Sequence, residues 1–243
     1  MLEAGIRSCC AAAVVVCSIV LGCALPPEAS TPPAGVATVP PPTVRVGDYW
    51  EYAVHDRYTG SPRGIYRYTV SHAGADRVVV DVTRDGERID AQTYTPDWSG
   101  IEHPLRNLQR FRYSPLYPAY AFPLYPGKRW RSAVSATDVQ TGKTYRMQVH
   151  ASVGGWRRMK VPAGEFDALE VRRSIYAGNA EFFNSQEEIV ETDWYAPSAG
   201  FFIASEGTSS HVDTSRSGGG RGDPPLRVRG DWLVAELVRY SAR

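Results

Sequence analysis

The feature that most constrains the fold of this chain is an alternation of apolar and polar residues that recurs from residue 44 to the end. Trp50, Tyr52 and Val54 fall on one face of an extended segment, and similar segments follow between clusters of Gly, Pro and Asp. Successive side chains of a β-strand point to opposite faces of a sheet, so this pattern is typical of half-buried strands joined by tight turns. We therefore expect an all-β globular domain over residues 44–243.

The pattern predicts about ten short strands and no long helix. Short turn sequences such as Asp85-Gly86 and Pro162-Ala163-Gly164-Glu165 favour antiparallel hairpins. The sequence thus predicts a single antiparallel meander that curls into a barrel, a half-barrel or a sandwich. Two Gly-x-x-Trp segments, residues 47–50 and 127–130, each open a predicted strand. They leave an internal duplication as an alternative to a single unrepeated unit.

All four cysteines lie near the N-terminus, at Cys9, Cys10, Cys17 and Cys23. A disulfide framework, a thiol nucleophile or a zinc site with sulfur ligands would need cysteines within the folded domain. The distribution therefore excludes these three kinds of site from residues 44–243.

A short apolar run over residues 9–22 follows Arg7 and ends before Pro26 and Pro27. A helix needs about 20 apolar residues to cross the hydrocarbon layer of a bilayer, and this run is shorter. We interpret residues 1–22 as a signal peptide. An uncleaved membrane anchor is the alternative.

The segment Val20-Leu21-Gly22-Cys23 resembles the lipobox of bacterial lipoproteins, in which a small residue precedes a cysteine that is lipidated and becomes the mature N-terminus. The resemblance implies diacylglycerol on the Cys23 thiol and an amide-linked acyl chain such as palmitate. Two or more acyl chains give stable membrane anchoring. Ala24, in place of Asp, resembles the sorting pattern of outer-membrane lipoproteins. We expect a protein of the cell envelope, held at the outer membrane and facing the periplasm.

Residues 23–43 are rich in Pro, Ala, Thr and Val and carry almost no charge. Proline-rich chain favours the extended polyproline conformation, at about 3.1 Å per residue, so roughly twenty residues span up to about 60 Å. We predict a disordered tether between the lipidated cysteine and the domain.

Three aromatic turn segments occur in order in the second half of the chain: Phe122 to Trp130, Val161 to Phe166 and Trp194 to Gly200. Together they resemble the TapB-like and related domains of exported proteobacterial proteins. This resemblance implies export and a β-rich fold. It implies no site residues, because the group has no established reaction.

No catalytic motif is present. The five histidines are scattered, and the sequence contains no G-x-S-x-G, no H-E-x-x-H and no phosphate-binding loop. The formal net charge of +1 gives no attractive field for nucleic acid. We expect no metal, no cofactor, no nucleic-acid partner and no enzymatic activity. The acidic residues Glu191 and Asp193, and the basic pair Arg172-Arg173, are interpreted as solvated positions on strands.

The segment 96–126 departs from the hairpin pattern, because six prolines alternate there with aromatic residues. Long loops in compact domains are more often functional than neutral. Aromatic side chains offer a large apolar area, which suits a lipophilic ligand or a protein partner. The candidate binding residues are Trp98, Phe111, Tyr113, Tyr117, Tyr120, Phe122 and Tyr125.

Our leading hypothesis is a non-catalytic, membrane-anchored envelope lipoprotein that binds a lipophilic molecule or an envelope protein. A ligand carrier would have an apolar cavity beneath residues 96–126, whereas an interaction module would be solid with an exposed apolar patch. The alternative is a hydrolase with a dispersed active site on strand ends, in which His and carboxylate side chains converge in one cleft.

Overall fold

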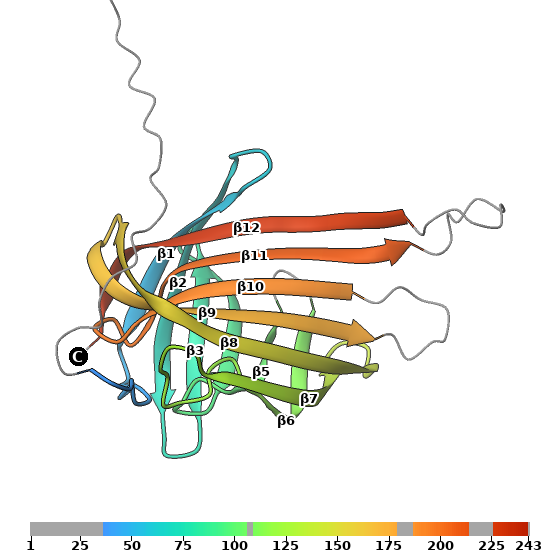
Figure 1. Ribbon diagram of the computed structural model, residues 1–243, viewed down its shortest axis with the longest axis horizontal. Helices are drawn as coiled ribbons and strands as arrows, with labels where there is room; N and C mark the ends of the chain where they lie inside the picture. Colours follow the sequence, from blue (N-terminus) through green and yellow to red (C-terminus); the bar gives the residue numbers. More distant parts are fainter. Residues whose placement is uncertain (1–35, 106–108, 179–186, 214–225, 243) are drawn as a thin grey trace, which may run out of the picture.

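The computed structural model describes residues 36–105, 109–178, 187–213 and 226–242 of the chain. Cys23 and most of the predicted signal peptide and tether lie outside these residues. Twelve antiparallel strands form one closed barrel in this part of the chain, in which each strand pairs with its neighbours in sequence and β12 pairs with β1 (Figure 1). The predicted all-β meander is confirmed, and its closed barrel was one of the three predicted forms.

The strands are β1 (Tyr49–Asp56), β2 (Pro62–Ala73), β3 (Val78–Arg84), β4 (Glu87–Tyr94), β5 (Gly100–Pro104), β6 (Arg110–Tyr117), β7 (Arg129–Asp138), β8 (Thr144–Val161), β9 (Gly164–Gly178), β10 (Glu187–Ala196), β11 (Phe201–Asp213) and β12 (Leu226–Ser241). Two of them, β5 and β6, lie within the segment that the sequence analysis treated as irregular. Within the described ranges, no helix is long and apolar enough to span a bilayer.

The two Gly-x-x-Trp segments have the same backbone structure. Gly47 and Gly127 have φ angles of 91° and 86°, which favour glycine, and their N–H groups donate to Val70 and Val153 on the next strand. In return, the N–H of Val70 donates to the carbonyl of Asp48, and that of Val153 to the carbonyl of Lys128. The repeated motif therefore marks equivalent corners, where β1 meets β2 and β7 meets β8.

The turns that follow these corners also match. Asp56 Oδ1 accepts the backbone N–H groups of Tyr58 and Thr59, and Asp138 Oδ1 accepts those of Gln140 and Thr141. Each turn ends in a Thr-Gly pair, at residues 59–60 and 141–142, with the glycine in a left-handed conformation. Asp-x-x-Thr-Gly is thus a second shared element, consistent with two related halves of six strands each.

Two apolar clusters fill the barrel interior. One contains Trp50, Trp98, Leu124 and Leu237, and it spans the strands β1 and β12 that close the barrel. The other gathers side chains of β6 to β10, among them Phe111, Val134, Met147, Val149 and Ile175. Both follow from the period-two pattern, because alternate residues of each strand face inward.

Residues 36–43, which the sequence analysis assigned to the tether, lie against the barrel. Val39 is 2% exposed, and it exchanges two backbone hydrogen bonds of 2.8 Å with Leu124, which is fully buried. Val36 and Val44 pack on the same apolar cluster. The packed domain therefore begins before the predicted boundary at residue 44.

Val39→Ala should lower the free energy of unfolding by about 2 kcal/mol, because it removes two buried methyl groups and leaves a small cavity. Urea denaturation of the mature protein measures the change. Val46→Ala is the matched control, since Val46 is 65% exposed and should change stability by less than about 0.5 kcal/mol. Equal effects of the two substitutions would show that the segment does not dock in solution.

Candidate ligand-binding cavity

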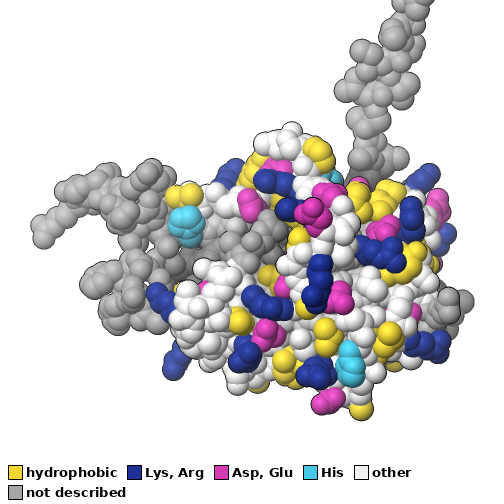
Figure 2. Space-filling view, turned by 180° about the vertical axis from the view of Figure 1, so that it is seen from behind, with side chains coloured by type: hydrophobic (Ala, Val, Ile, Leu, Met, Phe, Trp, Pro, Cys, Tyr) yellow, Lys and Arg dark blue, Asp and Glu magenta, His cyan; other side chains and the backbone are white. Residues whose placement is uncertain are grey.

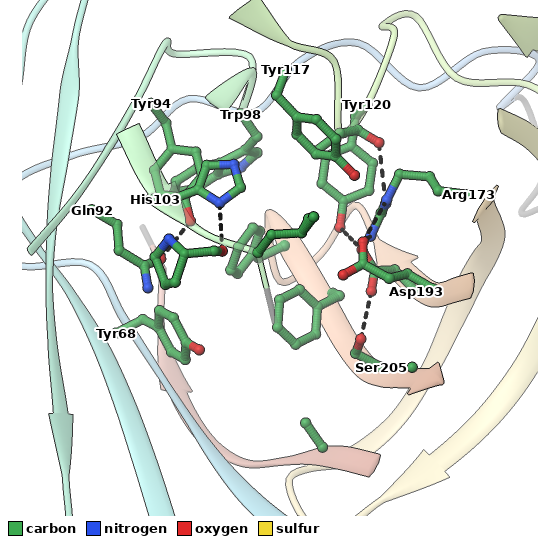
Figure 3. Close-up of a pocket in the computed structure, with 18 of the residues that line it drawn as sticks. Tyr68, Gln92, Tyr94, Trp98, His103, Tyr117, Tyr120, Arg173, Asp193 and Ser205 are labelled. Atoms are coloured by element: carbon green, nitrogen blue, oxygen red, sulfur yellow. Dashed lines mark hydrogen bonds and ion pairs between the residues drawn. The ribbon is translucent and has the colours of Figure 1, made fainter. Parts of the chain in front are cut away.

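A cavity of about 230 Å³ lies inside the barrel, between the two apolar clusters (Figure 3). Trp98, Tyr120 and Phe201 belong to the first cluster, and Leu105 and Tyr117 to the second. All five line the cavity. Its wall is largely aromatic, and it is completed by Tyr66, Tyr68, Tyr94, His103, Phe202, Val54, Pro104, Ala119, Leu233 and Ala235.

A polar cluster occupies one side of the cavity, where Arg173 of β9 lies opposite Glu191 of β10 in the sheet register. Arg173 Nη2 donates to Asp193 Oδ2 at 2.7 Å, and Nε and Nη2 donate to Glu191 Oε2 at 3.2 and 3.1 Å. Its Nη1 donates to the carbonyl of Ala119 at 3.2 Å. Each guanidinium nitrogen is thus hydrogen-bonded.

Asp193 is equally well satisfied. Tyr120 donates its hydroxyl to Oδ2 at 2.7 Å, and Ser205 donates to Oδ1 at 2.7 Å (Figure 3). The side chains of Arg173 and Asp193 are only 5% and 7% exposed. Buried charges of this kind are tolerated when hydrogen bonds and an opposite charge compensate their lost hydration.

Burial by itself would lower the pKa of Arg173, but the negative charges of Asp193 and Glu191 outweigh it and hold that pKa well above its usual value. Burial also raises the pKa of Tyr117 and of Tyr120, and neighbouring carboxylates raise it further. These phenols therefore stay neutral at physiological pH, while the guanidinium stays charged.

His103 lies on the opposite side of the cavity, stacked on Tyr94 with ring centroids 5.2 Å apart. Its Nδ1 lies 2.8 Å from the carbonyl oxygen of Pro104, so Nδ1 carries the proton in this tautomer. Nε2 is buried without a hydrogen-bond partner and lies against Gly100, where a Cβ atom would collide with it. Burial lowers the pKa of His103, so the imidazole is neutral near pH 7.

His103 and two carboxylates thus share one cavity, which the hydrolase alternative required. Their hydrogen bonds do not connect them, because His103 bonds to Pro104 while Asp193 bonds to Arg173, Tyr120 and Ser205. Among the described residues, no serine or threonine hydroxyl is hydrogen-bonded to a histidine, and no three His, Cys, Asp or Glu side chains are grouped to hold a metal ion. His103 and the Asp193 cluster therefore form two separate hydrogen-bonded groups in the cavity.

The predicted binding residues separate into three groups. Trp98, Tyr117 and Tyr120 line the cavity. Phe111 and Tyr113 are buried in the second apolar cluster. Phe122 packs at the edge of the first cluster, against Tyr120 and Tyr195, and Tyr125 is 42% exposed beside Lys128.

The polar residues of the cavity were misinterpreted from the sequence. Arg173 and Asp193 had been placed on the solvated side of their strands, but they face the barrel interior. Their position in the strand alternation could have identified them. Arg173, for example, lies between Val171 and Ile175 on the apolar side of its strand. A charge at an inward position of a strand points to a buried ion pair or a functional site.

Comparisons with known proteins give similar solved structures but no family. No known family and no curated protein sequence matches the chain. A protein from Parabacteroides distasonis, provisionally described as a lipoprotein, is 13% identical with a TM-score of 0.49, and the match covers 84% of this chain and 99% of that one. The resemblance to TapB-like domains stays a prediction.

Two further structures match. An exported protein with a YmcC-like fold from Bacteroides fragilis is 13% identical with a TM-score of 0.49, over 84% of this chain and all of that one. The hypothetical lipoprotein YmcC of Escherichia coli is 9% identical with a TM-score of 0.40, over 80% and 86% of the two chains. Identities this low transfer no function to this chain.

Arg173→Met should lower the free energy of unfolding by about 3–5 kcal/mol, because it leaves Asp193 and Glu191 as buried or half-buried charges without a cation. Urea denaturation measures the loss. Arg172→Met is the matched control, since the neighbouring arginine is exposed on the outer face of the same strand and should change stability by less than about 0.5 kcal/mol. A loss below 1 kcal/mol for Arg173→Met would contradict the role assigned to this ion pair.

Proposed function

We propose that this protein is a non-catalytic lipoprotein of the cell envelope, anchored through Cys23, whose barrel binds a small lipophilic ligand. The cavity between the two apolar clusters carries the second part of this proposal. It combines aromatic walls with a few hydrogen-bonded polar groups on one side, which is the composition of small-molecule sites. The lipobox-like segment Val20-Leu21-Gly22-Cys23 carries the first part.

A ligand is favoured over a protein partner by the distribution of exposed apolar residues. The large exposed apolar side chains in the described part of the chain are Val46, Tyr58, Ile65, Ile89, Leu116, Tyr125 and Val139, and each lies on a different strand, turn or loop. On the face shown in Figure 2, apolar groups are scattered among acidic and basic side chains. Partner-binding surfaces more often present one continuous apolar patch.

The size of the cavity limits the ligand. Sites for drug-sized molecules hold about 300–1,000 Å³, and this cavity holds about 230 Å³. We therefore infer a ligand of about ten non-hydrogen atoms, such as a short alkyl chain or a single ring with a side chain. A whole phospholipid is too large for it.

The Cys23→Ala substitution tests the anchor. Wild-type protein expressed from the full gene in a Gram-negative host should fractionate with membranes, and its N-terminal peptide should carry acyl chains on Cys23. The Cys23→Ala variant should lose the acyl mass and, once its signal peptide is removed, move to the soluble fraction, because no acyl chain remains to hold it at the bilayer. The comparison uses membrane fractionation and mass spectrometry, with Cys17→Ala as the control that should stay acylated. An unmodified wild-type N-terminus would refute the anchored form.

The Ala235→Phe substitution tests the cavity. Ala235 lines the cavity from β12, so a phenyl ring there should fill part of the space and weaken binding of 1-octanol at least about tenfold. Equilibrium dialysis against radiolabelled 1-octanol gives the dissociation constants. Ala133→Phe on the exposed face of β7 is the control, and it should bind as wild type does. Circular dichroism melting of both variants verifies that they fold. Equal affinities for folded Ala235→Phe and wild type would exclude this cavity as the binding site.

A further inference from the structure

The charged side chains that line the cavity do not balance. Arg173 contributes one positive charge, whereas Glu191 and Asp193 contribute two negative charges. The polar lining is completed by uncharged groups, which are the His103 imidazole, the Gln92 amide, the Ser205 hydroxyl and the tyrosine hydroxyls. The lining of the cavity therefore carries one negative charge in excess.

The excess charge is located on Glu191. Asp193 accepts hydrogen bonds on both carboxylate oxygens, whereas Glu191 accepts its two bonds from Arg173 on Oε2. Among the described residues, none donates to Glu191 Oε1. The Glu191 side chain is 18% exposed, more than that of Arg173 or Asp193. Its second oxygen is thus an acceptor that remains available at the cavity wall.

Arg173 offers an anion no comparable site. Its three guanidinium nitrogens all donate to protein oxygens, and its side chain is 5% exposed. Four of its five N–H groups donate to these oxygens, so a carboxylate or phosphate in the cavity would find one remaining N–H on Nη1. An anionic ligand would therefore meet a net negative charge and a guanidinium that is already paired with two carboxylates.

The aromatic walls favour a cation as well. Tyr120 already lies against a cation, since the Arg173 guanidinium carbon is 5.5 Å from its ring centroid. Tyr94, Trp98 and Phe201 are further aromatic residues that line the same space. The negative electrostatic potential over an aromatic face attracts ammonium groups, by roughly 0.5–2 kcal/mol for each contact.

We propose that the cavity selects small amphipathic cations, with the ammonium group of the ligand on Glu191 Oε1 and its apolar part against the aromatic wall. The chemical class is a primary or substituted amine with a short alkyl or arylalkyl body. This inference rests on the proposed function, because it requires that the cavity bind a lipophilic molecule at all. It narrows that function to ligands that are cationic and excludes free fatty acids.

Three probes with the same eight-carbon chain test the selection at pH 7: octylamine, 1-octanol and octanoate. The amine is protonated and the acid is ionised at this pH. Equilibrium dialysis of the mature protein should give the tightest binding for octylamine, at least about tenfold weaker binding for 1-octanol, and weaker binding still for octanoate. Octanoate binding as tightly as octylamine would overturn the inference while leaving a lipophilic site in place. Failure of all three probes to bind would overturn the proposed function itself.

The Glu191→Gln substitution tests whether the preference for a cationic ligand arises at Glu191. The substitution removes the excess charge and keeps the shape of the side chain, so the preference for octylamine over 1-octanol should fall to within about threefold. Glu188→Gln is the control, because Glu188 lies on the outer face of the same strand, paired with Arg227. It should keep the wild-type preference. An unchanged preference in Glu191→Gln would show that the selection does not arise at this carboxylate. If that variant does not fold, the order of the three probes on wild type still decides the inference.

Discussion

The structure depends on the pairing of the first strand with the last. β1 pairs with β2 on one side and with β12 on the other, in a register that joins Trp50 to Tyr240 and Asp56 to Leu233. This closure gives each strand a partner on both sides, so the sheet has no edge strand of the kind that favours aggregation. It also defines a single interior, so that every inward-facing side chain of twelve strands must be accommodated in the same enclosed space (Figure 1).

Enclosure explains why the few polar groups inside are so thoroughly bonded. Arg173 cannot reach bulk water from β9, so it is surrounded by Glu191, Asp193 and the carbonyl of Ala119. A cluster of this kind gives little net stability relative to an apolar core of the same shape, because desolvation offsets the attraction. The proposed ligand-binding role would account for its position beside an aromatic-lined cavity. The same enclosure strengthens the electrostatic effect of the uncompensated Glu191 carboxylate on a ligand in the cavity.

Sequence reasoning worked where one physical rule decided the outcome. Alternation located the strand around Trp50, and the Asp85-Gly86 turn joins β3 to β4 as expected. It failed where two rules competed. Prolines between residues 96 and 126 suggested a loop, yet β5 and β6 form there because Pro104 and Pro115 lie at positions that the barrel tolerates. The charge of Arg173 predicts a solvent-exposed position, but its place in the apolar alternation of the strand puts it inside the barrel.

The sequence by itself determined most of the strand-forming segments, the turns and the meander order, because these are local patterns of side-chain type and spacing. Only the tertiary structure decided which aromatic residues surround a cavity and which fill a core. Trp98 and Phe111 look alike in sequence, but one lines the cavity and the other lies in a solid cluster. It also decided that Arg173, Glu191, Asp193 and Tyr120 meet. Arg173 meets the two carboxylates through the register of the neighbouring strands β9 and β10, whereas Tyr120 reaches Asp193 from 73 residues away in the chain. No pattern within one strand encodes either contact.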